Sequence, residues 1–162
     1  MQGENLRNIL KKILSASELQ EGIAWHRRNY DANSIIIKQG DLGQTLFFIE
    51  KGVLRVAGKV ELDDRRQIQP GVCDLESGSI FGEICLHRSQ TRMATVTAAT
   101  DVKLLEIDGE SLSSYLDANP IQGYLFYKEL FGTMIKRLDV ANHRVESLMA
   151  WGLKVHDIDK YL

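Results

Sequence analysis

Short β-branched segments alternate with glycine turns through the middle of the chain, and this pattern limits the possible folds more than any other feature. The segments are rich in Ile, Val, Phe and Thr and cover residues 34–37, 45–49, 53–56 and 94–97. The turns between them are centred on Gly40-Asp41-Leu42-Gly43, Lys51-Gly52, Gly71 and Ser77-Gly78. Because no long helical stretch separates these strands, we expect antiparallel pairing. The pattern predicts an antiparallel β-roll over about residues 30–107, a double-stranded β-helix of the jelly-roll type.

The segment before the roll has helical periodicity. Its apolar residues recur at steps of three and four, at Leu6, Ile9, Leu10, Ile13 and Leu14, which is typical of an amphipathic helix. Ser15 and Ser17, followed by Glu18, then indicate a short second helix with a local cap. The roll is therefore expected to follow N-terminal helices.

Helical patterns return after the roll. A short helix is expected over residues 110–116, and Asn119-Pro120 opens a long C-terminal helix over about 120–149, since proline suits a first helical turn. The fold class is α+β, with helices flanking the roll in one domain over residues 1–150. Residues 151–162 form a C-terminal tail to which the sequence assigns no role.

Apolar residues follow a heptad spacing along the long helix, at Tyr124, Tyr127, Phe131, Met134, Leu138, Ala141, Val145 and Leu148. Such a seam is either the buried face of a helix packed on its own roll or the contact with the same helix of a second subunit. The bulky first three residues suit packing within the molecule. The rest extends beyond what one small roll covers, so we expect a homodimer through Met134, Leu138, Ala141, Val145 and Leu148. The basic residues interleaved with acidic ones should form a solvated face, at Lys128, Lys136, Arg137 and Arg144.

Composition excludes several classes of protein. A chain of 162 residues with 44% apolar residues can bury one core, and a formal charge of −2 gives no overall field for nucleic acid or anionic lipid. No apolar run of about 18 residues is present, so we expect a cytoplasmic protein without membrane contact. Cys73 and Cys85 read as ordinary thiols, and the four histidines are scattered without ligand spacing. No metal site is expected.

The sharpest local feature is a glycine beside a carboxylate, followed nine positions later by an arginine: Gly82, Glu83 and Arg92. Backbone amides of a short turn donate to phosphate oxygens, and a guanidinium adds a permanent charge with paired donors. Glu83 is placed to accept a hydrogen bond from a sugar hydroxyl. For an isolated Glu and Arg, the alternative is a solvated pair of surface charges beside a turn glycine.

Two motifs favour the first interpretation. Phe81-Gly82-Glu83 and Arg92 with Ala94-Thr95-Val96 resemble the phosphate-binding cassette of the cyclic nucleotide-binding domain family. The run from Gly40-Asp41-Leu42-Gly43 through Phe47-Phe48-Ile49 to Gly52 is similar to a second signature of that family. The resemblance covers about residues 6–145 and includes the order of helices and strands.

The resemblance implies roles for individual residues. Glu83 would bind the ribose 2′-hydroxyl and Arg92 the cyclic phosphate, with backbone amides completing the cradle near Gly82, Ile84, Cys85, Met93 and Ala94. The glycines Gly40, Gly43 and Gly52 would be structural and make no ligand contact. Three positions depart from the family pattern: Cys85 replaces a small residue, Thr91 a proline, and Met93 an Ala, Ser or Thr. Since threonine after the arginine is associated with cyclic GMP, the resemblance implies cyclic AMP here and makes cyclic GMP the lesser candidate.

The resemblance further implies a stand-alone sensor, not an enzyme, that signals by movement of its C-terminal helix. No direct binding of DNA is expected, because residues 151–162 are too few for a helix-turn-helix. One alternative is a module of the same fold that binds nothing in its pocket and serves as a scaffold or for dimerisation. The other is a cupin-like metal enzyme, although no histidine lies between Tyr30 and Cys85, where its ligands belong.

Overall fold

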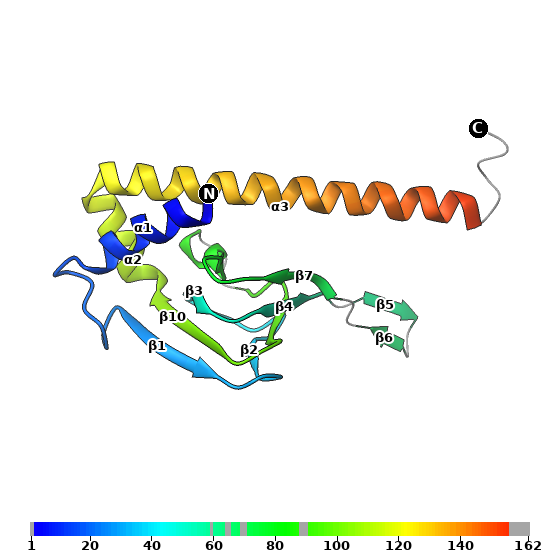
Figure 1. Cartoon of the computed structure of the whole chain (residues 1–162), viewed down its shortest axis with the longest axis horizontal. Helices are drawn as coiled ribbons and strands as arrows, with labels where there is room; N and C mark the ends of the chain where they lie inside the picture. Colours follow the sequence, from blue (N-terminus) through cyan, green and yellow to red (C-terminus); the bar gives the residue numbers. More distant parts are fainter. Residues whose placement is uncertain (1, 59, 64–65, 69–70, 88–90, 156–162) are drawn as a thin grey trace.

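The protein is an antiparallel β-roll packed beneath a long helix in this computed structural model (Figure 1). The structure describes residues 2–58, 60–63, 66–68, 71–87 and 91–155. Helix α1 (Gln2–Leu14) precedes the roll, and helices α2 (Gly109–Ala118) and α3 (Pro120–Val155) follow it. No helix in these ranges is both long enough and apolar enough to cross a membrane.

The roll consists of two four-stranded antiparallel sheets. One has the order β1-β10-β3-β8 and the other β2-β9-β4-β7, and β5 and β6 pair as a separate hairpin. The strands are β1 (Trp25–Tyr30), β2 (Ile35–Ile37), β3 (Thr45–Lys51), β4 (Leu54–Ala57), β5 (Val60–Asp63), β6 (Arg66–Ile68), β7 (Gly71–Leu75), β8 (Ile80–Phe81), β9 (Thr95–Ala98) and β10 (Val102–Asp108). The expected α+β class and antiparallel roll are confirmed.

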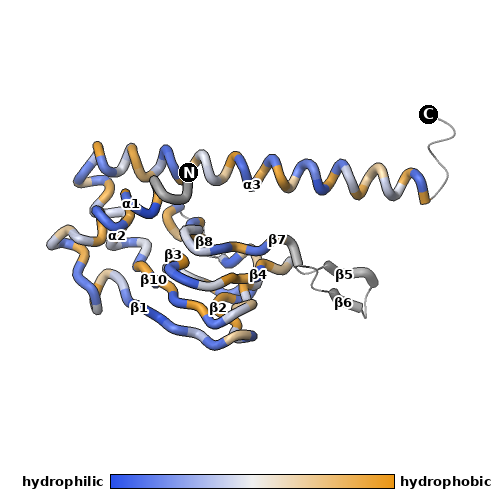
Figure 2. Tube along the Cα trace, in the orientation of Figure 1, coloured by the Kyte–Doolittle hydropathy of each residue, from blue (hydrophilic) through white to orange (hydrophobic). Residues whose placement is uncertain are grey.

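The sheet β1-β10-β3-β8 lies between two hydrophobic cores. Successive side chains of a strand point to opposite faces, so Leu46 and Phe48 enter a core shared with the helices, while Phe47 and Ile49 enter the interior of the roll. This explains why four apolar residues follow one another in the middle of β3, from Leu46 to Ile49. Figure 2 shows the same arrangement, with hydrophobic colour along β10 and hydrophilic colour along the outer strand β1.

Helices α2 and α3 are joined by a tight connection that sets the position of α3. Asp108 caps α2 by accepting from the Ser111 amide at 2.8 Å, as N-cap carboxylates do. Gly123 then lies so close to α2 that an added Cβ would be 2.7 Å from the Leu116 carbonyl oxygen. Phe126 and Leu130 follow on the same face and are buried against α1 and the roll.

Four expectations about the helices and the roll are corrected by the structure. The second N-terminal helix does not form: Ser15 bonds back to the Lys11 and Lys12 carbonyl oxygens, which ends α1, and turns follow. The Ser17 hydroxyl donates to the Glu18 side chain and caps nothing. The roll begins at Trp25, and Gly71 is the first residue of β7 and not a turn. Helix α3 continues to Val155, so residues 151–155 are helical; residues 156–162 lie outside the described ranges.

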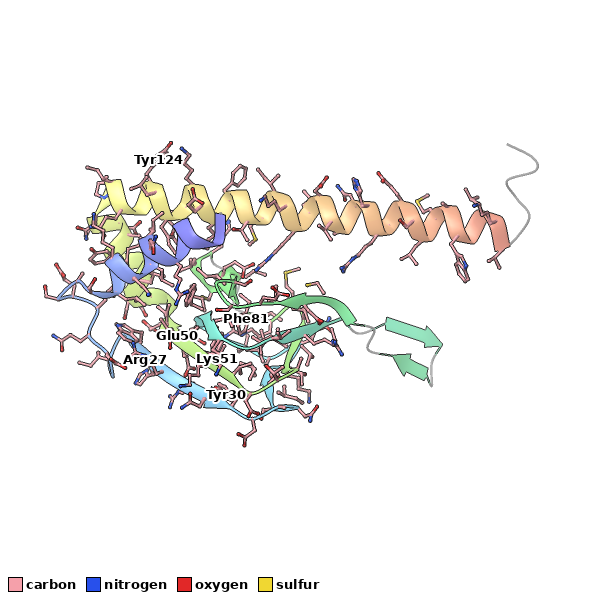
Figure 3. All side chains as sticks on the ribbon, in the orientation of Figure 1. Arg27, Tyr30, Glu50, Lys51, Phe81 and Tyr124 are labelled. Carbon is pink, nitrogen blue, oxygen red and sulfur yellow. The ribbon has the colours of Figure 1, made fainter. Side chains whose placement is uncertain are left out.

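Of the three bulky residues of the heptad seam expected to pack within the molecule, only Tyr127 does so in part, through Ser113 of α2 and the ring of Phe126. Tyr124 is 64% exposed and Phe131 is 67% exposed, and Tyr124 points away from the roll (Figure 3). Met134 is the one residue of the seam that packs against the core shared by the helices and the sheet β1-β10-β3-β8. Phe126 and Leu130, which lie outside the seam, supply the intramolecular contact because they continue the face begun by Gly123.

The close approach at Gly123 predicts opposite outcomes for two glycines of one helix. Alanine has a higher helix propensity than glycine, so Gly132→Ala, whose Cβ would meet nothing within 4 Å, should stabilise the fold by up to about 1 kcal/mol. Gly123→Ala has the same propensity gain but forces α2 and α3 apart. We expect a net destabilisation of about 1–3 kcal/mol, measured by urea unfolding; equal effects at both positions would contradict the role of this contact.

Candidate ligand-binding site

A pocket opens between the two sheets, beneath α3. It is lined by residues of β2, β4, β7, β8 and β9, by the short 3-10 helix η1 (Glu83–Leu86) and by Arg137 of α3. All seven residues named from the sequence lie in its wall: Gly82, Glu83, Ile84, Cys85, Arg92, Met93 and Ala94. The structure therefore brings the two halves of the motif together around one cavity.

Arg92 is the charged centre of this pocket. Its side chain is 8% exposed, and its guanidinium donates to the Thr45 carbonyl oxygen at 2.8 Å and to the Thr45 hydroxyl at 3.0 Å. A longer contact reaches the Gly82 carbonyl oxygen at 3.4 Å. Below it the guanidinium carbon lies 5.8 Å from the Phe47 ring centroid, and Phe47 stacks on Phe81 at 4.9 Å; Phe81 lies in the roll interior (Figure 3).

The charge of Arg92 has no direct ion-pair partner in the described part of the chain, although Glu83 and Glu106 act on it at longer range. Among the described residues, no carboxylate forms an ion pair with its guanidinium. Burial is the main influence on the group and lowers the pKa of Arg92, yet an arginine remains charged because its ordinary value lies far above neutral. A buried cation without an anion is costly, so the arrangement favours an anionic ligand.

The backbone around Arg92 is held by the glycine loop. The Arg92 amide donates to the Asp41 carbonyl oxygen at 2.8 Å, and the Gly40 amide donates to the Arg92 carbonyl oxygen at 2.9 Å. Leu42 and Thr91 form an isolated bridge beside them. Thr91 and Arg92 are thereby fixed to the opposite loop, although Thr91 lacks the restraint of a proline.

Glycine is required where η1 begins. Gly82 has a φ of 73°, in the left-handed region that side chains disfavour. An added Cβ there would also lie 2.8 Å from Nη1 of Arg92. Within η1, the Cys85 amide already donates to the Gly82 carbonyl oxygen at 3.3 Å, so this member of the expected amide cradle has a weak internal partner.

Glu83 faces a residue that the sequence did not single out. Nη1 of Arg137 lies 3.5 Å from Oε1 of Glu83, and Nη2 of Arg137 donates to the Ile80 carbonyl oxygen. Arg137 was expected on a solvated face, and this is wrong: its side chain is only partly exposed and lies in the pocket wall. The signal that was overlooked is its spacing, since Arg137 continues the face of Phe126, Leu130 and Met134 at steps of three and four.

Two departures from the family pattern prove compatible with an open pocket. Met93 is 70% exposed and so does not fill the cavity. The Cys85 thiol is half-buried against Gly109, where an added Cβ would lie 2.8 Å from Sγ. Burial raises the pKa of Cys85 to about 11, so the thiol stays neutral and serves as a small wall residue.

The rest of the cavity wall is mostly apolar. Ile37, Val56, Leu75 and Val96 supply side chains from the sheet β2-β9-β4-β7. The pocket thus offers two guanidinium groups, of Arg92 and Arg137, a carboxylate and a hydrophobic wall. This arrangement suits a ligand with an anionic group, a hydroxyl and a flat apolar body. Within the described ranges, no three His, Cys, Asp or Glu side chains are grouped so that they could hold a metal ion.

Comparison with known proteins agrees with this geometry. The family model described as "Cyclic nucleotide-binding domain" matches residues 27–119. The chain is 31% identical to cGMP-dependent protein kinase 2 of Mus musculus over 126 residues, which are 76% of this chain and 16% of the kinase. It is 42% identical to the cAMP-activated global transcriptional regulator Vfr of Pseudomonas aeruginosa over 86 residues, 51% of this chain and 38% of the regulator.

The fold is also similar to solved structures. The catabolite activator protein of Thermus thermophilus superposes with a TM-score of 0.66 and 25% sequence identity, covering 88% of this chain and 59% of that one. The chain spans well under half the length of the two curated relatives, so their activities as whole proteins are not carried over. The family match, the roll and the cassette agree, and the chain belongs to the cyclic nucleotide-binding domain family.

Proposed function

We propose that this domain is a sensor without catalytic activity that binds cyclic AMP in preference to cyclic GMP and reports the bound state through α3. The observation that carries the proposal is the buried guanidinium of Arg92, which lines the pocket and has no carboxylate partner in the described part of the chain. A cyclic phosphodiester supplies one negative charge and the acceptors that a guanidinium binds best.

The chemistry of the wall orients the rest of the nucleotide. With phosphate at Arg92, the ribose hydroxyl meets Glu83, and the base extends along Ile37, Val56 and Val96. These side chains offer no hydrogen bond. Guanine carries more polar groups on its ring than adenine and loses more on burial against an apolar wall, which favours cyclic AMP. The names of the relatives include both nucleotides, as cGMP-dependent and cAMP-activated.

Removal of the Arg92 guanidinium tests whether the cyclic phosphate of the ligand binds there. Hydrogen bonds to charged groups contribute about 1.5–3 kcal/mol each, so Arg92→Ala should weaken cyclic AMP binding by at least about 100-fold in isothermal titration. Arg55→Ala is the matched control, because Arg55 is an exposed arginine of β4 paired with Asp74; its affinity should equal that of the wild type. Cyclic GMP should bind more weakly than cyclic AMP to every variant.

The same titration separates the proposal from its alternative. Wild-type protein that releases no heat with either nucleotide would be a scaffold of this fold and would refute the sensor. Equal binding by the wild type and Arg92→Ala would show that the nucleotide occupies some other place.

Arg137 supplies a physical route from the pocket to α3. It is anchored on α3 and touches both the cassette carboxylate of Glu83 and the end of β8 at Ile80. A ribose hydroxyl that donates to Glu83 changes the strength of the contact between Glu83 and Arg137. The helix therefore has two arrangements relative to the cassette, and the ligand shifts their populations.

Hydrogen exchange tests this route. Amides of α3 between Tyr124 and Leu138 should exchange more slowly when cyclic AMP is bound, and Arg137→Ala should abolish most of this protection while nucleotide is held at saturating concentration. Lys136→Ala is the control, since Lys136 is the exposed neighbour. Protection that persists in Arg137→Ala would remove Arg137 from the route.

The exposed seam of α3 supports a homodimer as the output. Leu138, Val145 and Leu148 are exposed and lie on helix that extends beyond the packed cores. A heptad seam of this kind pairs with a copy of itself about a two-fold axis. Met134, also expected at this interface, packs partly on its own core and leaves the rest of its side chain for a partner.

A charge in the seam tests the dimer. Val145→Glu buries a carboxylate between helices if the seam is paired, and sedimentation velocity should show a monomer in place of a dimer. Ser147→Glu adds the same charge outside the seam and should leave the dimer intact. A monomeric wild type at tens of micromolar, or equal effects of both variants, would contradict pairing through the seam.

A further inference from the structure

We propose that Gly43 is a positioning residue for the phosphate-binding arginine: the missing side chain at Gly43 creates the space in which the Arg92 guanidinium lies. This inference rests on the proposed function, because it assigns to the glycine loop a part in ligand binding. Glycines of that loop were expected only to form turns, and Gly43 in fact lines the pocket itself.

The distances at Gly43 leave no room for any side chain. A Cβ built there would lie 2.1 Å from Nε, 2.4 Å from Cζ and 2.4 Å from Nη2 of Arg92. Gly82 closes the other side, where a Cβ would lie 2.8 Å from Nη1. The guanidinium therefore occupies a slot between two glycines from different segments of the chain.

Backbone conformation is not the reason for glycine at this position. The glycines with positive φ are Gly22, Gly40, Gly52, Gly78 and Gly82, and Gly43 is not among them. An alanine at Gly43 would thus keep an ordinary backbone. The three nearest atoms to its Cβ would all belong to Arg92, which distinguishes Gly43 from Gly40, where the backbone has a positive φ and an added Cβ meets nothing within 4 Å.

The slot also selects one pose of the arginine. Thr45 follows Gly43 by two residues and supplies the two shortest acceptors of the guanidinium, its carbonyl oxygen and its hydroxyl. Space and acceptors thus come from one short segment that leads into β3. Because the clash with an added Cβ falls on the end of a flexible side chain, Arg92 would move while the strand stays in place.

The first experiment is Gly43→Ala in the full chain, with Gly132→Ala as the matched control. We expect Gly43→Ala to retain the thermal unfolding midpoint within a few degrees and to lose about 10- to 100-fold in cyclic AMP affinity, the effect of misplacing charged hydrogen bonds. Gly132→Ala has open space around its Cβ and should bind as the wild type does.

A double-mutant cycle with Arg92→Lys separates positioning from a general structural effect. Lysine has a slimmer end without the planar fork, so it does not need the slot. Gly43→Ala should therefore cost less than about 2-fold in the Arg92→Lys background, and the two losses should be strongly non-additive. Additive losses, or wild-type affinity in Gly43→Ala, would overturn the role of Gly43 while leaving the proposed function standing.

A spectroscopic measurement tests the placement without nucleotide. The Nε–H signal of Arg92 in the ligand-free protein, assigned by its loss in Arg92→Lys, should shift in Gly43→Ala and not in Gly132→Ala. An unmoved signal would overturn the slot. If the signal shifts but the wild type binds neither nucleotide, the slot exists, and both the proposed function and the positioning role that rests on it are refuted.

Discussion

The buried guanidinium of Arg92 is the interaction on which the site depends. It is held by neutral acceptors at Thr45 and Gly82, lies over Phe47, and has no carboxylate partner among the described residues. Such a group contributes little to the stability of the fold, because the free-energy cost of desolvating a charge exceeds the free energy gained from hydrogen bonds to neutral acceptors. The surrounding structure has to supply the stability that the site does not, and an anionic ligand supplies the missing charge.

That stability comes from the two cores on either side of one sheet. Strand β3 contributes to both, through Leu46 and Phe48 on one face and Phe47 and Ile49 on the other. The same strand begins at Thr45, which holds Arg92, and the loop before it carries Gly43. The arginine is thus attached to a strand that packs into both cores, so its pose is set by elements that are costly to move.

The sequence predicted the roll and the residues of the pocket wall because those signals are local. Phe81 to Val96 is one continuous stretch, and turn glycines separate strands of opposite direction. Arg137, Thr45 and Gly43 were missed as site residues because they lie far in sequence from the cassette. The spacing of Arg137 shows its face of the helix but not its neighbour Glu83, and Thr45 and Gly43 act through a backbone oxygen, a hydroxyl and empty space. The second N-terminal helix was wrong for a related reason: the serine hydroxyls bond to the preceding carbonyl oxygens and a neighbouring side chain, so they end a helix and do not begin one.

Helix α3 has one face packed on the domain and one exposed apolar face, and the proposed signalling connects the two. The inner face packs Gly123, Phe126 and Leu130 on the domain and ends at Arg137 in the pocket wall. The seam on the exposed side is apolar and lies on the same continuous helix. A helix without proline after its first turn has no built-in point of bending, so a displacement at Arg137 has to reorient the whole distal segment.

The contact between Arg137 and Glu83 is partly exposed and long, which makes it weak. The proposed signalling requires a weak contact, because a single ribose hydroxyl shifts the helix only where the helix is held by a small margin over an alternative position.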